Sequence, residues 1–206
     1  MKNVGEKDVS SYYHALQDES RIGARINVSD TLYGRFEYGP ENRVANVRML
    51  YGRWDFGGGR LYVGKYYTPM SLSESNQVYV GNTMVGFGAL YAGLQEGLKL
   101  TFMKGAIQIG AYDPSKYASL GTTKEYKLPK VEASIYLPLG NLSVYGGGGY
   151  QTYETDEAIA YYLQAVITLA PGVSITPEIG VMDLKKGSAS CSGQNSDGHW
   201  KVLIKR

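Results

Sequence analysis

The feature that most constrains this chain is an alternation of apolar and polar side chains with a period of two residues, which recurs from residue 20 onward. Alternation with this period places one set of side chains on each face of a β-strand. In the first such block the apolar set is Ile22, Ala24, Ile26 and Val28. The polar set is Arg21, Gly23, Arg25 and Asn27. The sequence therefore predicts a strand with one apolar and one charged face.

A second block follows a tight turn at Ser29 and Asp30, so the two blocks predict an antiparallel hairpin. Its apolar face holds Leu32, Phe36 and Tyr38, and its polar face holds Tyr33, Arg35 and Glu37. Similar blocks recur at 97–102, 106–112, 130–137, 142–145, 159–169 and 173–181, with long polar connections at 113–128 and 185–198. Short turns alternating with long loops predict an all-β, antiparallel, up-and-down transmembrane β-barrel of about 10 to 12 strands.

Composition supports amphipathic strands and gives no argument for nucleic-acid binding. The chain has 27 Gly and 19 Tyr but only 4 Phe, and tyrosine suits positions with one apolar and one wet side. The net charge of +2 comes from 21 basic and 19 acidic residues spread along the chain, without the basic block typical of nucleic-acid partners. No run of about 20 apolar residues is present that could cross a bilayer as a helix.

Strand length favours a membrane barrel over a soluble one. Blocks of about ten residues match a tilted strand that crosses the hydrocarbon core, whereas strands of soluble sheets usually have about five or six. The charged faces also carry Gly, Ser, Gln and Tyr, which suit a wet lumen, and four aromatic residues are expected at strand ends: Tyr38, Tyr51, Phe102 and Tyr150. A non-conducting barrel anchor and a soluble β-barrel binding protein remain as alternatives.

The predicted lumen face carries several charged residues that are candidates for lining a pore. They are Arg21, Arg25, Arg35, Glu37, Arg48, Lys130 and Glu132. One interpretation is that these are ion pairs of the kind any water-filled barrel contains. The other is that the basic residues face acidic loop residues across the lumen and create a transverse field. Such a field would orient dipolar solutes and bias the pore weakly toward anions.

The residues for catalysis or metal binding are sparse. His14 and His199 lie at opposite ends of the sequence, and Cys191 is a single cysteine, so neither a metal site nor a Ser-His-Asp relay has enough members. We therefore expect no metal, no cofactor, no catalytic residue and no enzymatic activity. Residues 59–65 fit the start of a phosphate loop, but Tyr66 follows where Ser or Thr is needed. The glycines at 146–149 lie within a predicted strand and indicate a smooth groove for a neighbouring aromatic ring or subunit.

Three stretches, taken in order, resemble the trimeric porins of Gram-negative outer membranes. They are 15–25, 50–57 and 61–69, and the similarly spaced hairpins extend the resemblance over about residues 12 to 184. The resemblance implies a homotrimer in membrane lipid that passes small polar solutes and ions. It also implies that residues 66–96 fold into the barrel as a constriction loop, with Lys65 at its root and with Glu74 and Glu96 as its acidic residues.

Lys65 conflicts with strict alternation, which would place it beside Leu61 and Val63 on the lipid side. Its place in the pore therefore requires a strand end or a bulge near Gly64. The chain also departs from such porins at both ends. Residues 1–19 are predicted as loop and lack the apolar region of a signal peptide, and residues 20–206 hold too few strands for a porin and end in Ile204, Lys205 and Arg206. We expect a partial porin chain that forms a passive diffusion pore in the bacterial outer membrane.

Overall fold

The computed structural model describes residues 20–41, 44–71, 93–113, 128–153, 156–185 and 199–205. These residues form eleven β-strands and one short 3-10 turn, η1 (Met103–Gly105). The strands are β1 (Ile22–Asn27), β2 (Leu32–Glu41), β3 (Val44–Asp55), β4 (Gly59–Tyr67), β5 (Leu94–Phe102), β6 (Ile107–Tyr112), β7 (Lys130–Leu139), β8 (Leu142–Tyr153), β9 (Asp156–Ala170), β10 (Val173–Lys185) and β11 (His199–Lys205). In the described part of the chain, no helix is long and apolar enough to cross a membrane.

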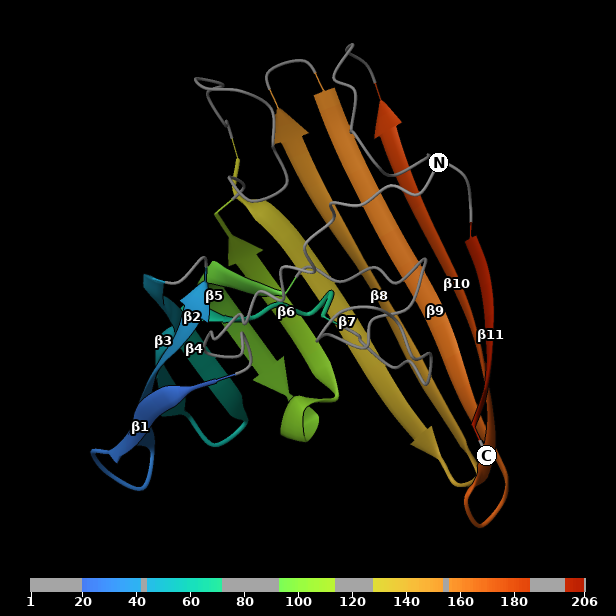
Figure 1. Ribbon diagram of the computed structural model, residues 1–206, viewed down its shortest axis with the longest axis horizontal. Helices are drawn as coiled ribbons and strands as arrows, with labels where there is room; N and C mark the ends of the chain where they lie inside the picture. Colours follow the sequence, from blue (N-terminus) through green and yellow to red (C-terminus); the bar gives the residue numbers. More distant parts are fainter. Residues whose placement is uncertain are drawn as a thin grey trace, which may run out of the picture.

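All eleven strands belong to one antiparallel sheet in which each strand pairs with its neighbours in sequence, from β1 through to β11. The ribbon shows long, tilted strands that curve around one side of the molecule (Figure 1). This order confirms the predicted all-β, up-and-down architecture and the predicted number of strands. Within the described strands, β1 pairs only with β2 and β11 only with β10, so the sheet is open.

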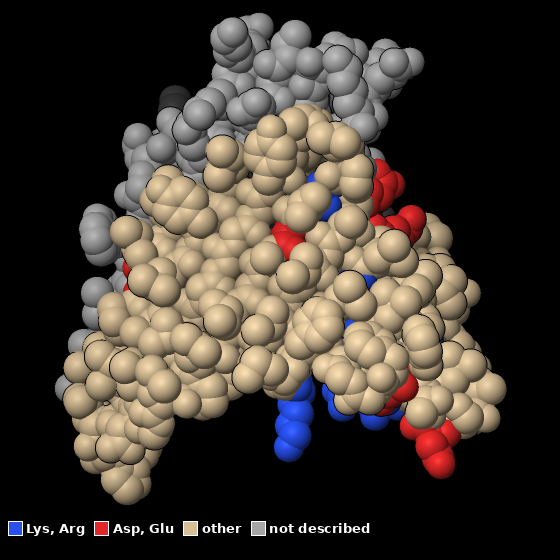
Figure 2. All heavy atoms as spheres, turned by 180° about the vertical axis from the view of Figure 1, so that it is seen from behind, with Lys and Arg blue, Asp and Glu red and all other residues tan. Residues whose placement is uncertain are grey.

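The two faces of the sheet carry side chains in the opposite arrangement to a soluble barrel, with apolar residues outside and polar residues inside. One face, called here the outer face, carries exposed apolar side chains such as Ile22 (76% exposed), Leu163 (53%) and Leu169 (60%). The opposite, inner face buries polar and charged side chains, among them Glu37, Gln95, Lys99, Lys130, Glu132, Gln151, Gln164 and Glu178. Seen from behind, the surface consists mostly of uncharged residues (Figure 2). Because exposed apolar side chains are costly in water, this arrangement excludes the soluble alternative.

Glycines shape both the turns and the wall of the sheet. Gly140 (φ 68°) and Gly172 (φ 78°) adopt left-handed backbone conformations in the turns before β8 and β10, which glycine permits without a steric cost. In β8, the inner-face Gly147 lies under the ring of Tyr162, since a Cβ at Gly147 would approach the Tyr162 Cε1 atom to 2.7 Å. The predicted groove that receives a neighbouring aromatic ring is therefore present in β8.

One prediction about the sheet is wrong, and the approximate bounds of another are adjusted. Tyr51 does not lie at a strand end: it lies inside β3 and is buried on the inner face, where it packs with Met49 and Tyr62. The long insertion was predicted to begin at residue 66 and to end at 96. Pairing between β4 and β5 instead extends to Tyr67 opposite Leu94. Hydrogen bonds between the two strands continue past the residues whose apolar and polar side chains clearly alternate. The connection between these strands therefore spans 68–93.

Candidate functional site

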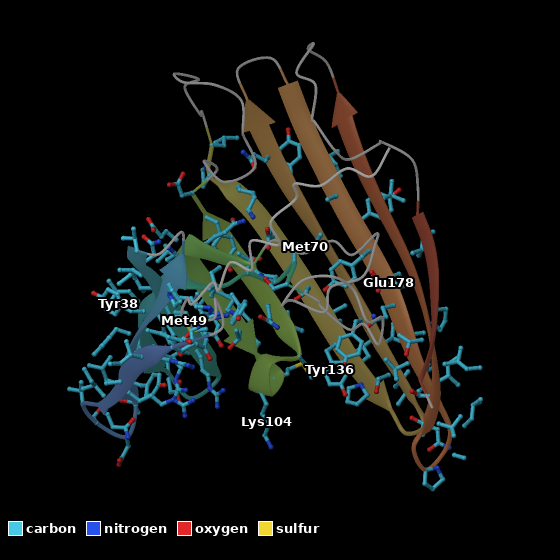
Figure 3. All side chains as sticks on the ribbon, in the orientation of Figure 1. Tyr38, Met49, Met70, Lys104, Tyr136 and Glu178 are labelled. Atoms are coloured by element: carbon cyan, nitrogen blue, oxygen red, sulfur yellow. The ribbon has the colours of Figure 1, made fainter. Side chains whose placement is uncertain are left out.

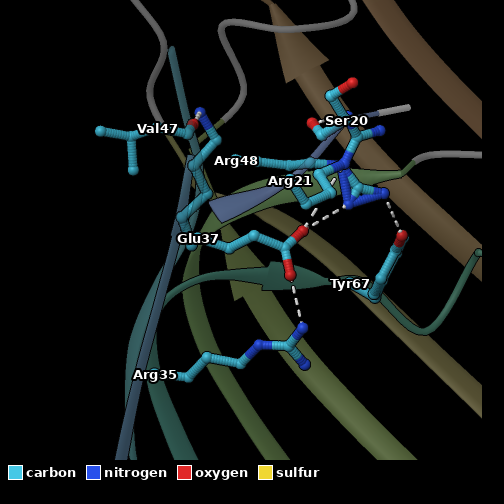
Figure 4. A network of polar contacts seen from close by, with 8 residues as sticks. Ser20, Arg21, Arg35, Glu37, Val47, Arg48 and Tyr67 are labelled. Atoms are coloured by element: carbon cyan, nitrogen blue, oxygen red, sulfur yellow. Dashed lines mark hydrogen bonds and ion pairs between the residues drawn. The ribbon is translucent and has the colours of Figure 1, made fainter. Parts of the chain in front are cut away.

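Three arginines gather around one carboxylate on the inner face of β1 to β3 (Figure 4). Glu37 is 6% exposed and pairs directly with Arg35 on the same strand. A second oxygen of Glu37 accepts a hydrogen bond from Arg48 at 3.0 Å, and the Nε atom of Arg21 lies 3.7 Å from the same oxygen. Among the described side chains of this cluster, one carboxylate therefore lies between three arginines.

A β-bulge places Arg48 in this cluster. Register shifts between Glu37 and Tyr38, so that both Arg48 and Met49 lie opposite Glu37. A bulge of this kind turns two successive residues toward one side of the sheet. Arg48 can then donate to the hydroxyl oxygen of Tyr67 at 2.7 Å as well as to Glu37. The bulge thus connects the arginine cluster to the end of β4.

A second basic cluster lies at the end of β3 and the start of β4. Asp55 lies 3.1 Å from the Nε atom of Arg53 and 3.5 Å from that of Arg60. The guanidinium group of Arg53 also lies 4.6 Å from the centre of the Tyr33 ring, within the range of a cation–π interaction. The inner face of the β1 to β4 region therefore carries six arginines against Glu37 and Asp55: Arg21, Arg25, Arg35, Arg48, Arg53 and Arg60.

The chain after β4 folds across the inner face. The amide of Met70 donates to Glu132 of β7 at 2.9 Å, and the carbonyl of Pro69 accepts from the hydroxyl of Tyr162 of β9 at 3.5 Å. The start of this segment is fixed to the start of β5, because Thr68 donates from its amide and Ser71 from its hydroxyl to the carbonyl of Gly93. Met70 lies in front of the middle of the sheet (Figure 3) and is 3% exposed. Residues 68–71 therefore occupy the space that the sheet curves around.

The wall opposite the arginines is close to neutral. Lys130 pairs with Glu132, which is 1% exposed, and Lys130 also lies 5.4 Å from the centre of the Tyr112 ring. Further along, Gln164 of β9 donates to Glu178 of β10 at 3.1 Å. The charge of the inner face is thus uneven, with the positive excess on the β1 to β4 side.

The structure brings together most of the residues predicted to line a pore. Inner-face positions are occupied by Arg21, Arg25, Arg35, Glu37, Arg48, Lys130 and Glu132. Arg25 is exposed and lies opposite Arg35 in register, within a strand that is solvent-accessible throughout.

Lys65 and Glu96 do not lie where they were expected. Lys65 is in register with Leu50 and Glu96 on the outer side, and its ammonium group donates to the carbonyl of Val47. Gly64 (φ 121°) is irregular, yet the alternation continues through it. Glu96 belongs to β5 rather than to the loop, because strand pairing extends past it. Glu74 lies outside the described residues.

Several inner-face residues were missed from the sequence. Arg53 and Arg60 follow the same alternation as Tyr51 and Tyr62, so the pattern alone could have revealed them. Lys99 is 6% exposed on the inner face of β5, between the outer residues Leu98 and Leu100. Its single charge within a mostly apolar block was the only signal available. Among the described residues, no group of three or more His, Cys, Asp or Glu side chains could hold a metal ion.

No protein-family model matches the chain, and none of the curated proteins matches it. Solved structures of OmpT, an outer membrane protein of Vibrio cholerae, are similar in fold. The in-vitro folded trimer form gives a TM-score of 0.44 at 12% identity, over 89% of this chain and 72% of that chain. The mutant lacking loop L8 gives a TM-score of 0.43 at 14% identity, over 82% of this chain and 74% of that chain.

The reversed polarity and the up-and-down sheet define this chain as an outer-membrane β-barrel protein. Strands can cross a membrane only as a barrel with an apolar outer belt, and such barrels are typical of bacterial outer membranes, so the predicted location is confirmed. The expectation that the chain is not an enzyme is corrected. Its structural neighbours carry the name OmpT and are described only as outer membrane proteins, so they do not support that expectation. One fold can host unrelated functions. The β-barrel fold therefore does not exclude catalysis.

Proposed function

We propose that this protein is a porin-type diffusion pore for ions and small hydrophilic solutes, with a weak preference for anions. The observation that carries the proposal is the course of residues 68–71, which cross the inner face and bind Glu132 of β7. A segment in this position narrows any water-filled passage along the sheet and separates the arginine-rich wall from the neutral one. Charges placed around a narrow passage act strongly on permeating ions.

The anion preference follows from the uneven charge of the inner face. Six arginines face the passage on the β1 to β4 side, and among the side chains that the structure describes there the carboxylates between them are Glu37 and Asp55. Charges in a cleft with low-dielectric walls raise the local concentration of oppositely charged ions. We expect small anions to enter more readily than cations of the same size.

A conducting pore also requires that the free edges of β1 and β11 be paired. An unpaired strand edge within hydrocarbon leaves backbone groups without hydrogen bonds. Pairing of the two edges with each other, with a further segment or with a second copy meets this requirement. A homotrimer is part of the proposal and is tested by chemical cross-linking in detergent, where a three-subunit band is expected and a monomer alone would contradict it.

The test of the pore is single-channel recording after reconstitution of the full chain into planar bilayers. Stepwise conductance is the expected result, and a heat-modifiable folded band without conductance would favour the non-conducting anchor. The double variant Arg21→Glu with Arg25→Glu should move the reversal potential in a salt gradient toward cation selectivity. The control is Lys104→Glu, since Lys104 lies exposed in the η1 turn, away from the clusters (Figure 3). Equal shifts in both variants would mean that the arginines do not face the passage.

A further inference from the structure

A cavity of about 330 Å³ lies on the inner face, between residues 68–71 and strands β5 to β9. This volume is at the lower end of the roughly 300–1,000 Å³ that hold small-molecule ligands. It therefore suits a solute with one ring better than an extended chain of rings. Its lining contains five tyrosines: Tyr66, Tyr67, Tyr136, Tyr145 and Tyr162.

The tyrosines present aromatic surface to this cavity in a fixed arrangement. Tyr136 and Tyr145 stack with their ring centres 4.5 Å apart and an angle of 27° between the planes. On the other side, Tyr66 stacks on Tyr62 at 4.9 Å and 15°. Aromatic rings attract a further ring in offset or edge-to-face geometry. The cavity therefore offers aromatic walls that are already in place.

Lys99 is the one charged residue among the described residues that line this cavity. Its ammonium group donates to the carbonyl of Tyr67 at 2.8 Å and lies 4.1 Å from the centre of the Tyr66 ring. An ammonium group has three N–H donors, and no carboxylate in the described part of the chain forms an ion pair with Lys99. Donors therefore remain for an anion, while Thr68, Ser71 and Gln108 supply neutral polar groups nearby.

On the basis of the proposed pore function, we infer that this cavity is a selective binding site for small aromatic monocarboxylates along the diffusion path. The aromatic ring of such a solute packs against Tyr136 and Tyr145, and its carboxylate accepts from Lys99. A neutral sugar fits less well, because the described lining residues include no carboxylate to accept from its hydroxyl groups. A cyclic solute without a charge, or an anion without a ring, uses only half of the site.

Three probes of similar size separate these contributions: benzoate, cyclohexanecarboxylate and benzamide. The first readout is the concentration of each probe that halves the potassium chloride conductance in planar bilayers. The second is binding to the full-length detergent-solubilised protein by isothermal titration calorimetry, which does not depend on conduction. Benzoate should act at the lowest concentration in both. If benzamide is as potent as benzoate, the site does not recognise the charge. If cyclohexanecarboxylate is as potent as benzoate, the site does not recognise the aromatic ring. Either result overturns the assignment.

Lys99→Gln should raise the benzoate concentration required in both readouts by about tenfold, as expected for the loss of one charge-assisted hydrogen bond. Lys99→Gln should leave the benzamide concentration required in both readouts unchanged. Lys104→Gln is the matched control, because Lys104 is exposed in η1 and does not line the cavity. Tyr136→Leu should weaken benzoate more than cyclohexanecarboxylate, and it tests the site if Lys99→Gln fails to fold.

The two readouts distinguish failure of the site from failure of the pore. Conductance without block or binding by benzoate would refute the site and leave the pore standing. Benzoate binding that depends on Lys99, without conductance, would refute the pore and leave the site standing.

Discussion

Glu37 is the residue whose removal tests the electrostatics of the inner face most directly. The change Glu37→Gln keeps the size and shape of the side chain but leaves Arg21, Arg35 and Arg48 without their common anion. Removing one partner of a buried ion pair costs about 3–5 kcal/mol. The three arginine side chains are 23–25% exposed, so water screens part of their repulsion and we expect about 3 kcal/mol.

Urea unfolding of protein refolded into lipid vesicles, followed by tryptophan fluorescence, measures this loss. With a slope of about 2–3 kcal/mol per molar urea, a loss of about 3 kcal/mol lowers the midpoint by roughly 1–1.5 M. Asp30→Asn is the control, since Asp30 is exposed in the turn between β1 and β2, and its midpoint should stay within about 0.3 M of the original. Adding Arg35→Gln to Glu37→Gln should recover part of the loss, because one of the three repelling charges disappears.

The reasoning is refuted if Glu37→Gln and Asp30→Asn have the same midpoint. It is also refuted if Arg35→Gln adds its full separate cost to that of Glu37→Gln, because the two residues would then not interact. An unchanged slope in all variants is needed to attribute the shift to the folded state.

Three further predictions concern the wall, the outer belt and the inward segment. Gly147→Ala should lower the unfolding free energy by about 1–3 kcal/mol because its Cβ meets the Tyr162 ring at 2.7 Å, whereas Gly146→Ala, with contacts of 3.6 Å or more, should change it little. Leu163→Arg on the outer face should destabilise the vesicle-embedded protein by about 2–4 kcal/mol, and Gln108→Arg on the inner face should not; equal losses would contradict the assigned faces. Met70→Pro deletes the N–H that binds Glu132 and should raise single-channel conductance, while Met70→Ala keeps that N–H and should not.

The alternation of side chains was enough to predict the sheet, because its period is fixed by the strand backbone and does not depend on distant contacts. The blocks 22–28 and 159–169 follow the pattern, and most of their outer-face apolar residues are exposed, among them Ile26, Leu163 and Leu169. Short turns account for the pairing of β1 with β2 and of β7 with β8. Pairing across the long connections, such as that between β6 and β7, follows from the alternation of short turns and long loops typical of up-and-down barrels. The same alternation also contained Arg53, Arg60 and Lys99, which were overlooked because each lies among aromatic or apolar residues.

The inward course of residues 68–71 could not be read from local pattern. It depends on hydrogen bonds across 62 and 93 positions of sequence, from Met70 to Glu132 and from Tyr162 to Pro69. The bulge that turns Arg48 inward depends on the register between β2 and β3 rather than on residue type. For Lys65 the local pattern was correct and the resemblance was not. The resemblance to porins predicted that Lys65 lies in the pore, whereas alternation of side chains through Gly64 predicted the outer side, where the structure places it.

In the proposed pore, the distribution of charge ties stability and permeation to the same side chains. The arginines of β1 to β4 repel one another, and a fully dry interior would make that repulsion prohibitive. They are tolerated because each keeps roughly a quarter or more of its side chain exposed while Glu37 and Asp55 lie between them. The condition that keeps the wall stable is therefore partial hydration, which is also the condition under which its positive excess acts on ions in the passage. A dry and tightly paired inner face would be more rigid, but it would present no net field to a solute.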